Sequence, residues 1–178
     1  MKLYFETSNF PWSPERYHYA AEQMMLTLFP GEKPEYPEGP LPRDLSGEAN
    51  AAVFTLHRGK KLTNISVLVF RPQGYYNGVS RFPSEELDCP PEEVYHTVQH
   101  ALKLAFYKAG TALLGTQPPW GALTGVRPVK LPTRSMLAGS TPKQAQKELE
   151  KEYFVSPERA KLAVDCARAS VEAQRSLR

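Results

Sequence analysis

Alternation of apolar and polar residues predicts three short strands in the first half of the chain. The alternating segments are residues 2–7, 51–57 and 62–70. The turn sequence Arg58-Gly59-Lys60-Lys61 joins the second segment to the third, so these two predict a hairpin. Residues 71–90 are rich in Pro and Gly and predict a loop, with room for one short strand. The apolar faces consist of Leu3, Phe5, Ala52, Phe54, Leu56, Ile65, Val67 and Val69.

Helical periodicity predicts two longer elements in the same half. Ser13-Pro14-Glu15 is a typical helix start, and Pro30-Gly31 ends this helix after residue 29. Pro90-Pro91 begins the second helix, which Gly115 ends after residue 114. Their apolar stripes consist of Tyr17, Ala20, Ala21, Met24, Met25 and Leu28, and of Val94, Val98, Ala101, Leu102, Ala105, Ala109, Ala112 and Leu113.

The C-terminal third shows helical patterns throughout. Residues 128–137 predict a short helix ended by Gly139, and Thr141-Pro142-Lys143-Gln144 predicts a capping box at the start of the next. Ser156-Pro157-Glu158 begins the last helix, and residues 174–178 carry no stop signal, as expected for a chain cut in or just after a helix. The expected core positions are Ala145, Leu149, Ala160, Ala163, Val164, Ala167 and Val171, with Cys166 beside them as a small packing residue.

These elements predict an α+β protein. A small, mainly antiparallel sheet in the order β-α-β-β-α forms a first domain over residues 1–117, and residues 118–178 form a helical subdomain. Five prolines between residues 30 and 48 predict a plain surface loop rather than a packed element.

Composition adds a cellular setting. Hydrophobic residues make up 41% of the chain, which is typical of a globular protein. The two cysteines, Cys89 and Cys166, give neither a disulfide framework nor zinc-ligand spacing, and so favour a reducing cytoplasm. The first six residues include charges, unlike a signal peptide, and no apolar run is long enough to span a membrane.

The net charge of +3 is unevenly distributed. Residues 120–178 contain 11 Lys and Arg against 6 Asp and Glu, whereas residues 1–119 contain 11 against 13. The basic end is either a solvated helix surface or a face that meets an anion, such as a carboxylated substrate, nucleic acid or an acidic partner.

Familiar catalytic motifs are missing from the sequence. There is no dinucleotide-binding, Walker, metalloprotease or nucleophile-elbow motif. His96 and His100 have a spacing that can hold a metal on a helix. However, His96 lies roughly 200° around the helix from Val94, which favours a polar surface, and we expect no metal in this chain.

The stretch from Pro118 to Leu131 is chemically the most unusual part of the chain. It combines one Trp, two Gly, three Pro, one Arg and one Lys between two helical regions. Its glycines permit backbone angles that other residues avoid, and Pro128 keeps Arg127 out of helical geometry. We therefore expect a structured loop that leads into a helix, with Arg127 on the bend. The candidate contact residues are Trp120, Gly121, Thr124, Gly125, Arg127 and Lys130.

The run PWGALTGVRPVKL, residues 119–131, resembles the HemZ-type, radical-SAM coproporphyrinogen III dehydrogenases, a branch of the oxygen-independent coproporphyrinogen oxidases. The resemblance continues through residues 136–139, 149–153 and 155–162. In that family this segment lies just before the catalytic domain. The resemblance implies that the chain is the N-terminal accessory region of a longer protein.

In that family the catalytic domain carries a Cys-x3-Cys-x2-Cys loop for a [4Fe–4S] cluster and uses S-adenosylmethionine. This chain has no such loop, and two cysteines cannot supply three thiolate ligands. The resemblance therefore implies no cofactor in this chain and no activity of the chain alone. It implies a parent enzyme that decarboxylates propionate groups to vinyl groups in haem biosynthesis, with its own radical-SAM domain and a porphyrinogen as partners.

Two interpretations of the 118–131 loop remain. In one, Arg127 and Lys130 grip a substrate carboxylate beside a helix N-terminus, and Trp120 lies against an apolar ring. In the other, Trp120 fills a junction, the glycines shape the turn, and Arg127 binds loop carbonyls or the missing domain.

The competing class is a small RNA-binding or protein-interaction module. Tyr75-Tyr76 with Arg71 and Arg81 could form an aromatic, basic surface. The sequence pI of about 8.8 is lower than that of typical nucleic-acid-binding domains. We therefore expect neither a nucleic-acid nor a membrane partner.

Overall fold

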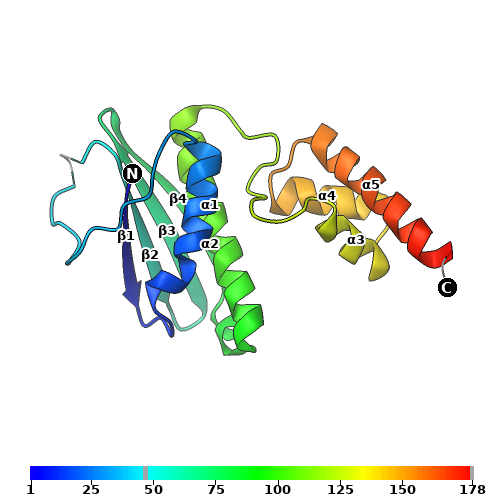
Figure 1. Cartoon of the computed structure of the whole chain (residues 1–178). Helices are drawn as coiled ribbons and strands as arrows, with labels where there is room; N and C mark the ends of the chain where they lie inside the picture. The colour runs from blue at the N-terminus through cyan, green and yellow to red at the C-terminus, as the bar shows by residue number, and fades with distance from the viewer. Residues whose placement is uncertain (46–47, 177–178) are drawn as a thin grey trace. The chain divides into compact units, whose positions relative to one another are not determined.

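The computed structural model describes residues 1–45 and 48–176. They belong to two compact units, Met1–Thr116 and Gln117–Arg178, here named the sheet unit and the helical unit (Figure 1). The predicted α+β class is confirmed, because a mainly antiparallel sheet is followed by a C-terminal helical region.

The sheet unit contains four strands in the spatial order β1-β2-β3-β4. The β1 and β2 strands are parallel, and the other two pairs are antiparallel. The bounds are β1 (Lys2–Ser8), the 3₁₀ helix η1 (Pro14–Tyr17), α1 (His18–Leu28), β2 (Ala51–Arg58), β3 (Leu62–Arg71), β4 (Gly74–Pro83), the 3₁₀ helix η2 (Ser84–Asp88) and α2 (Pro91–Leu114).

The fourth strand is longer than predicted, because residues 71–90 were expected to form a loop with room for one short strand. It spans ten residues and pairs with β3 from Gly74 opposite Arg71 to Pro83 opposite Leu62. The glycine that argued against a strand is required by packing. A Cβ on Gly78 would lie 1.9 Å from the Ala105 carbonyl oxygen, so only glycine lets β4 approach α2 this closely.

The helices α1 and α2 lie on one face of the sheet (Figure 1). All the predicted core residues of η1 and α1 are buried, and α2 is buried along its stripe from Val94 to Ala109. The stripe ends there, because Ala112 is exposed. Gly115 adopts a left-handed φ of 65° and caps α2 at the predicted place.

The opposite face of the sheet carries a second small core. Tyr4, Ala51 and Val53 are buried there, and Leu41 and Leu45 of the proline-rich connector pack against them. The prediction that this connector is not a packed element is therefore wrong for these two leucines, because each can bury apolar surface on the sheet. Residues 46–47 of the predicted loop lie outside the described residues.

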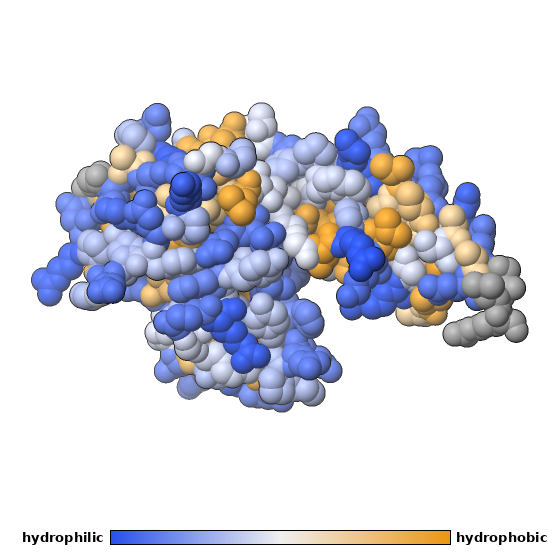
Figure 2. All heavy atoms as spheres, viewed as in Figure 1, coloured by the Kyte–Doolittle hydropathy of each residue, from blue (hydrophilic) through white to orange (hydrophobic). Residues whose placement is uncertain are grey.

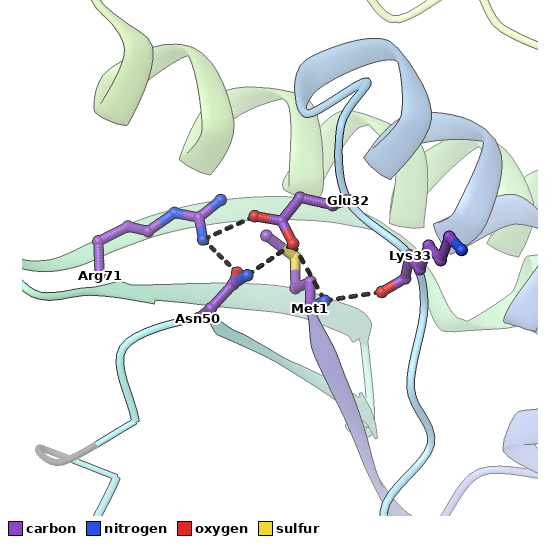
Figure 3. Close-up of polar contacts among 5 residues, drawn as sticks. All are labelled: Met1, Glu32, Lys33, Asn50 and Arg71. Atoms are coloured by element: carbon purple, nitrogen blue, oxygen red, sulfur yellow. Dashed lines mark hydrogen bonds and ion pairs between the residues drawn. The ribbon is translucent and has the colours of Figure 1, made fainter.

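A polar network joins the start of β1 to the connector and to β3 (Figure 3). The Met1 amine donates to Glu32 Oε2 at 3.2 Å and to the Lys33 carbonyl at 2.7 Å. Asn50 Nδ2 also donates to Glu32 Oε2, at 2.6 Å, and Arg71 donates to both Glu32 and Asn50. Burial raises the pKa of Glu32, but these hydrogen bonds and the two positive charges outweigh burial, so the pKa lies below its ordinary value.

The helical unit contains α3 (Lys130–Leu137), α4 (Pro142–Glu152) and α5 (Pro157–Ser176). The predicted capping box is present at α4: the Gln144 N–H donates to Thr141 Oγ1, and the Thr141 N–H donates to Gln144 Oε1 at 2.8 Å. One apolar core joins the three helices, and it includes every predicted core position of α4 and α5.

Two details of this unit differ from the sequence-based expectation. The helix α3 begins at Lys130 rather than Pro128, which leaves Pro132 in the first turn, where a missing N–H costs little. Cys166 is exposed rather than packed beside the core. The last two residues of the expected cut helix end, 177–178, lie outside the described residues.

Candidate functional site

The first half of the 118–131 loop is fixed to the junction between α4 and α5. The Ala122 N–H donates to the Tyr153 carbonyl at 2.7 Å, and the Ser156 N–H donates to the Pro119 carbonyl at 3.0 Å. Gly121 has a φ of 57°, and a Cβ there would lie 2.1 Å from the same Tyr153 oxygen. Gly121 therefore serves a close backbone approach and presents no group to a ligand.

Trp120 packs inside the helical unit. Its indole is half-buried against the unit's core, and the Arg159 guanidinium lies 5.6 Å from the ring centroid. A cation at this distance from an indole face is attracted by the ring's quadrupole. Trp120 thus has a packing role, although its partly exposed ring can still report on nearby binding.

The middle of the loop is buried. Ala122, Leu123 and Thr124 are each less than a tenth exposed, and Leu123 belongs to the core of the unit. The predicted contact residue Thr124 is therefore not on the surface. An apolar pocket of about 330 Å³ opens beside this half of the loop, between Pro118-Pro119 and the Phe154–Pro157 junction.

The second half of the loop is exposed. Gly125 has a φ of 69° and begins a surface segment in which Val126 and Arg127 are both exposed. The Lys130 N–H donates to the Arg127 carbonyl at 3.0 Å, so a turn at Arg127 leads directly into α3, as the sequence predicted.

Three cations follow one another along this segment: Arg127, Lys130 and Arg134, here named the basic face. All three are exposed, and Lys130 and Arg134 are one helical turn apart on α3. None of them forms an ion pair with a described residue. Figure 2 shows hydrophilic and hydrophobic residues interleaved over the helical unit, and the exposed apolar side chains include Val126 and Leu137 at either end of the basic face.

The exposed cations of the basic face have the chemistry needed to bind an anion. Guanidinium and ammonium groups hold carboxylates by charge-assisted hydrogen bonds. Tyr153 packs against the core of the unit, and burial and the charge of Glu148 raise the pKa of its phenol. Within the described ranges, no three His, Cys, Asp or Glu side chains are grouped to hold a metal.

The aromatic and basic residues of β3 and β4 do not form one surface. Tyr75 and Tyr76 are consecutive in β4 and therefore point to opposite faces of the sheet. Arg71 is held by Glu32, and its guanidinium lies 4.7 Å from the Phe29 ring. This arrangement weakens the RNA-binding alternative.

Sequence reasoning missed two parts of the site. Arg134 was not among the predicted residues, although its spacing from Lys130 was a usable signal. The contact of Arg159 with Trp120 carried no local signal, because it depends on how α5 packs. The structure thus divides the six predicted residues into a packed group (Trp120, Gly121 and Thr124) and an exposed group (Gly125, Arg127 and Lys130).

The fold and the site define a small α+β unit followed by a basic three-helix unit. No protein-family model matches this chain, and no solved structure matches it. The chain is similar to the oxygen-independent coproporphyrinogen-III oxidase-like protein HemZ of Bacillus subtilis (strain 168), with 31% identity over 75 residues. The match covers 42% of this chain and 15% of that protein's length. No described helix combines the length and apolar character needed to cross a bilayer.

Proposed function

We propose that this chain is the N-terminal accessory region of a HemZ-type, oxygen-independent coproporphyrinogen III dehydrogenase. The single observation that carries the proposal is the 31% identity over 75 residues with HemZ. The parent protein would act in haem biosynthesis, in the cytoplasm. Its S-adenosylmethionine and [4Fe–4S] cluster would belong to a catalytic domain outside this chain.

The residues of this chain do not fit an iron–sulfur cluster. Such clusters are held by several Cys thiolates. The only two cysteines, Cys89 and Cys166, lie in different units and are both exposed. No catalytic step is therefore assigned to this chain, and its role in the parent enzyme is a binding role.

The proposed binding surface is the basic face. Its three cations have no ion-pair partner among the described residues, although each is held on a loop or helix fixed by backbone hydrogen bonds. A porphyrinogen with carboxylate side chains offers matching anions, as does an acidic patch on the catalytic domain. Arg127 at the bend and Lys130 at the start of α3 would grip a carboxylate, with Arg134 beside them.

A fluorescence titration tests the substrate form of this proposal. The chain has two tryptophans, so Trp12→Phe leaves Trp120 as the reporter. Coproporphyrin III, a stable tetracarboxylate, should quench Trp120, and Arg127→Ala with Lys130→Ala should weaken the affinity about tenfold, equivalent to about 1.4 kcal/mol.

The matched control is Lys143→Ala with Lys147→Ala, which removes two exposed cations from α4 of the same unit. Equal weakening by both pairs would show that the porphyrin responds only to net charge. An affinity unchanged by Arg127→Ala with Lys130→Ala would reject substrate contact at the basic face.

A further inference from the structure

Among the residues that the structure describes, β4 pairs only with β3, so the sheet has an open edge along β4. The direction of its backbone groups follows from one bond beyond its end, in which the Ser84 N–H donates to the Lys61 carbonyl at 2.9 Å. Bonded and non-bonded residue pairs alternate along an antiparallel ladder. Ser84 is a hydrogen-bonded position, so the even-numbered residues of β4 form the backbone hydrogen bonds to β3. The odd-numbered residues Tyr75, Asn77, Val79 and Arg81 turn their backbone N–H and C=O groups to the open edge.

One of these outward groups has a side-chain partner. Lys108 of α2 reaches past the sheet and donates its Nζ to the Val79 carbonyl oxygen at 2.9 Å. Lys108 is itself exposed, so its amine lies at the rim and not between sheet and helix. It places a solvated positive charge at the middle of the edge, where an incoming strand would need the same carbonyl.

The opposite edge of the sheet is protected differently. Along β1, the Leu3 N–H donates to the Glu35 carbonyl at 2.8 Å, and the Glu35 N–H donates to the Met1 carbonyl at 3.0 Å. The connector thus covers part of the β1 edge with its own backbone. No such segment pairs with β4 among the described residues. At that edge, the Lys108 amine instead occupies a backbone carbonyl. Lysine at an edge is a known means of preventing strand pairing.

The strand that best fits the open edge is β4 of a second copy. A closed two-fold dimer pairs the same strand from each copy, and two-fold symmetry makes the pair antiparallel, as β4 already is with β3. Arg81 is the only charged residue in β4. It lies toward one end, so antiparallel pairing separates the two Arg81 side chains instead of opposing them. Tyr75 is 68% exposed, and this dimer would bury part of its apolar surface.

We propose that the Lys108 amine prevents strand pairing at the β4 edge, and that its removal lets β4 of two copies pair into one continuous sheet. The proposal concerns the sheet unit and does not depend on the function proposed above. The test compares Lys108→Met, which keeps the aliphatic stem, with Lys108→Arg, which keeps a donor. Sedimentation velocity over a wide range of concentration should show the wild type and Lys108→Arg at the 20.0 kDa of one chain, and Lys108→Met approaching twice that mass.

A second substitution tests where the association occurs. Asn77→Pro removes an N–H that faces the open edge and leaves the ladder to β3 intact, because proline is tolerated at edge strands. Lys108→Met with Asn77→Pro should return to the mass of one chain, with circular dichroism confirming that the fold remains. The proposal is overturned if Lys108→Met stays at one-chain mass, if the double variant still associates, or if the wild type already pairs through β4.

Discussion

The two units of this protein use their charges in opposite ways. In the sheet unit the ion pairs join residues distant in sequence: Met1 and Arg71 with Glu32, Lys2 with Glu48, and Arg58 with Asp88. In the helical unit the ion pairs are local, one helical turn apart, as between Lys161 and Asp165. The basic face stays outside these pairs. The ion pairs of the sheet unit link segments that are distant in sequence, whereas the cations of the basic face have no ion-pair partner among the described residues.

Each unit nevertheless contains a glycine at a very close backbone contact. Gly78→Ala would place a Cβ 1.9 Å from the Ala105 oxygen, and Gly121→Ala would place one 2.1 Å from the Tyr153 oxygen. Each should lower the free energy of unfolding by about 4 kcal/mol, the range of severe packing defects. Hydrogen exchange should show lost protection in β4 and α2 for the first variant and in the helical unit for the second.

The matched control is Gly31→Ala, because no atom lies within 4 Å of a Cβ at Gly31 and its φ is not in the left-handed region. It should change stability by less than about 0.5 kcal/mol. Equal losses in all three variants would contradict a role for the close contacts, because the restriction that Gly→Ala places on the unfolded chain stabilises a protein by itself.

The Glu32 network should make the stability of the sheet unit depend on pH. The folded-state pKa of Glu32 is lowered, so its stabilisation is fully present above the unfolded-state value near 4.5 and is lost as the pH falls through the lower folded-state value. Glu32→Gln should cost about 1–2 kcal/mol at neutral pH, because it weakens hydrogen bonds to two charged groups. Urea unfolding followed from pH 7 downward should show this difference shrinking below about pH 4.5. A constant difference at every pH would show that the carboxylate charge is not involved.

The basic face should contribute little to folding. Arg127→Ala with Lys130→Ala should change the free energy of unfolding by less than about 0.5 kcal/mol, because these exposed side chains have no described ion-pair partner. Lys161→Ala, which breaks an exposed helical pair, should be similarly mild. A loss of several kcal/mol in the Arg127 and Lys130 variant would support the structural interpretation of the loop and reduce the contrast between the units.

The sequence predicts an element well when the residues that determine it lie close to it in the chain. The capping box at Thr141 and Gln144 and the Gly115 cap lie within a few residues of the helix ends they define, and both were predicted correctly. The β4 strand was expected only as one short strand within a loop, because its glycine is explained only by the approach of α2. The packing of Leu41 on the sheet also depends on distant residues.

The candidate site shows the same limit. The pattern of Pro, Gly and Trp identified the loop, but exposure could not be read from it. Thr124 proved buried and Arg127 exposed, because Leu123 beside Thr124 anchors the loop in the core of the unit.

The most direct test of the central claim is a residue-by-residue map of where the tetracarboxylate binds. Coproporphyrin III is added to ¹⁵N-labelled chain, and the backbone amide shifts are followed by nuclear magnetic resonance. The largest perturbations should lie between Gly125 and Arg134 and should disappear in the Arg127→Ala, Lys130→Ala variant. Perturbations centred on the sheet unit, or unaffected by those substitutions, would contradict that claim.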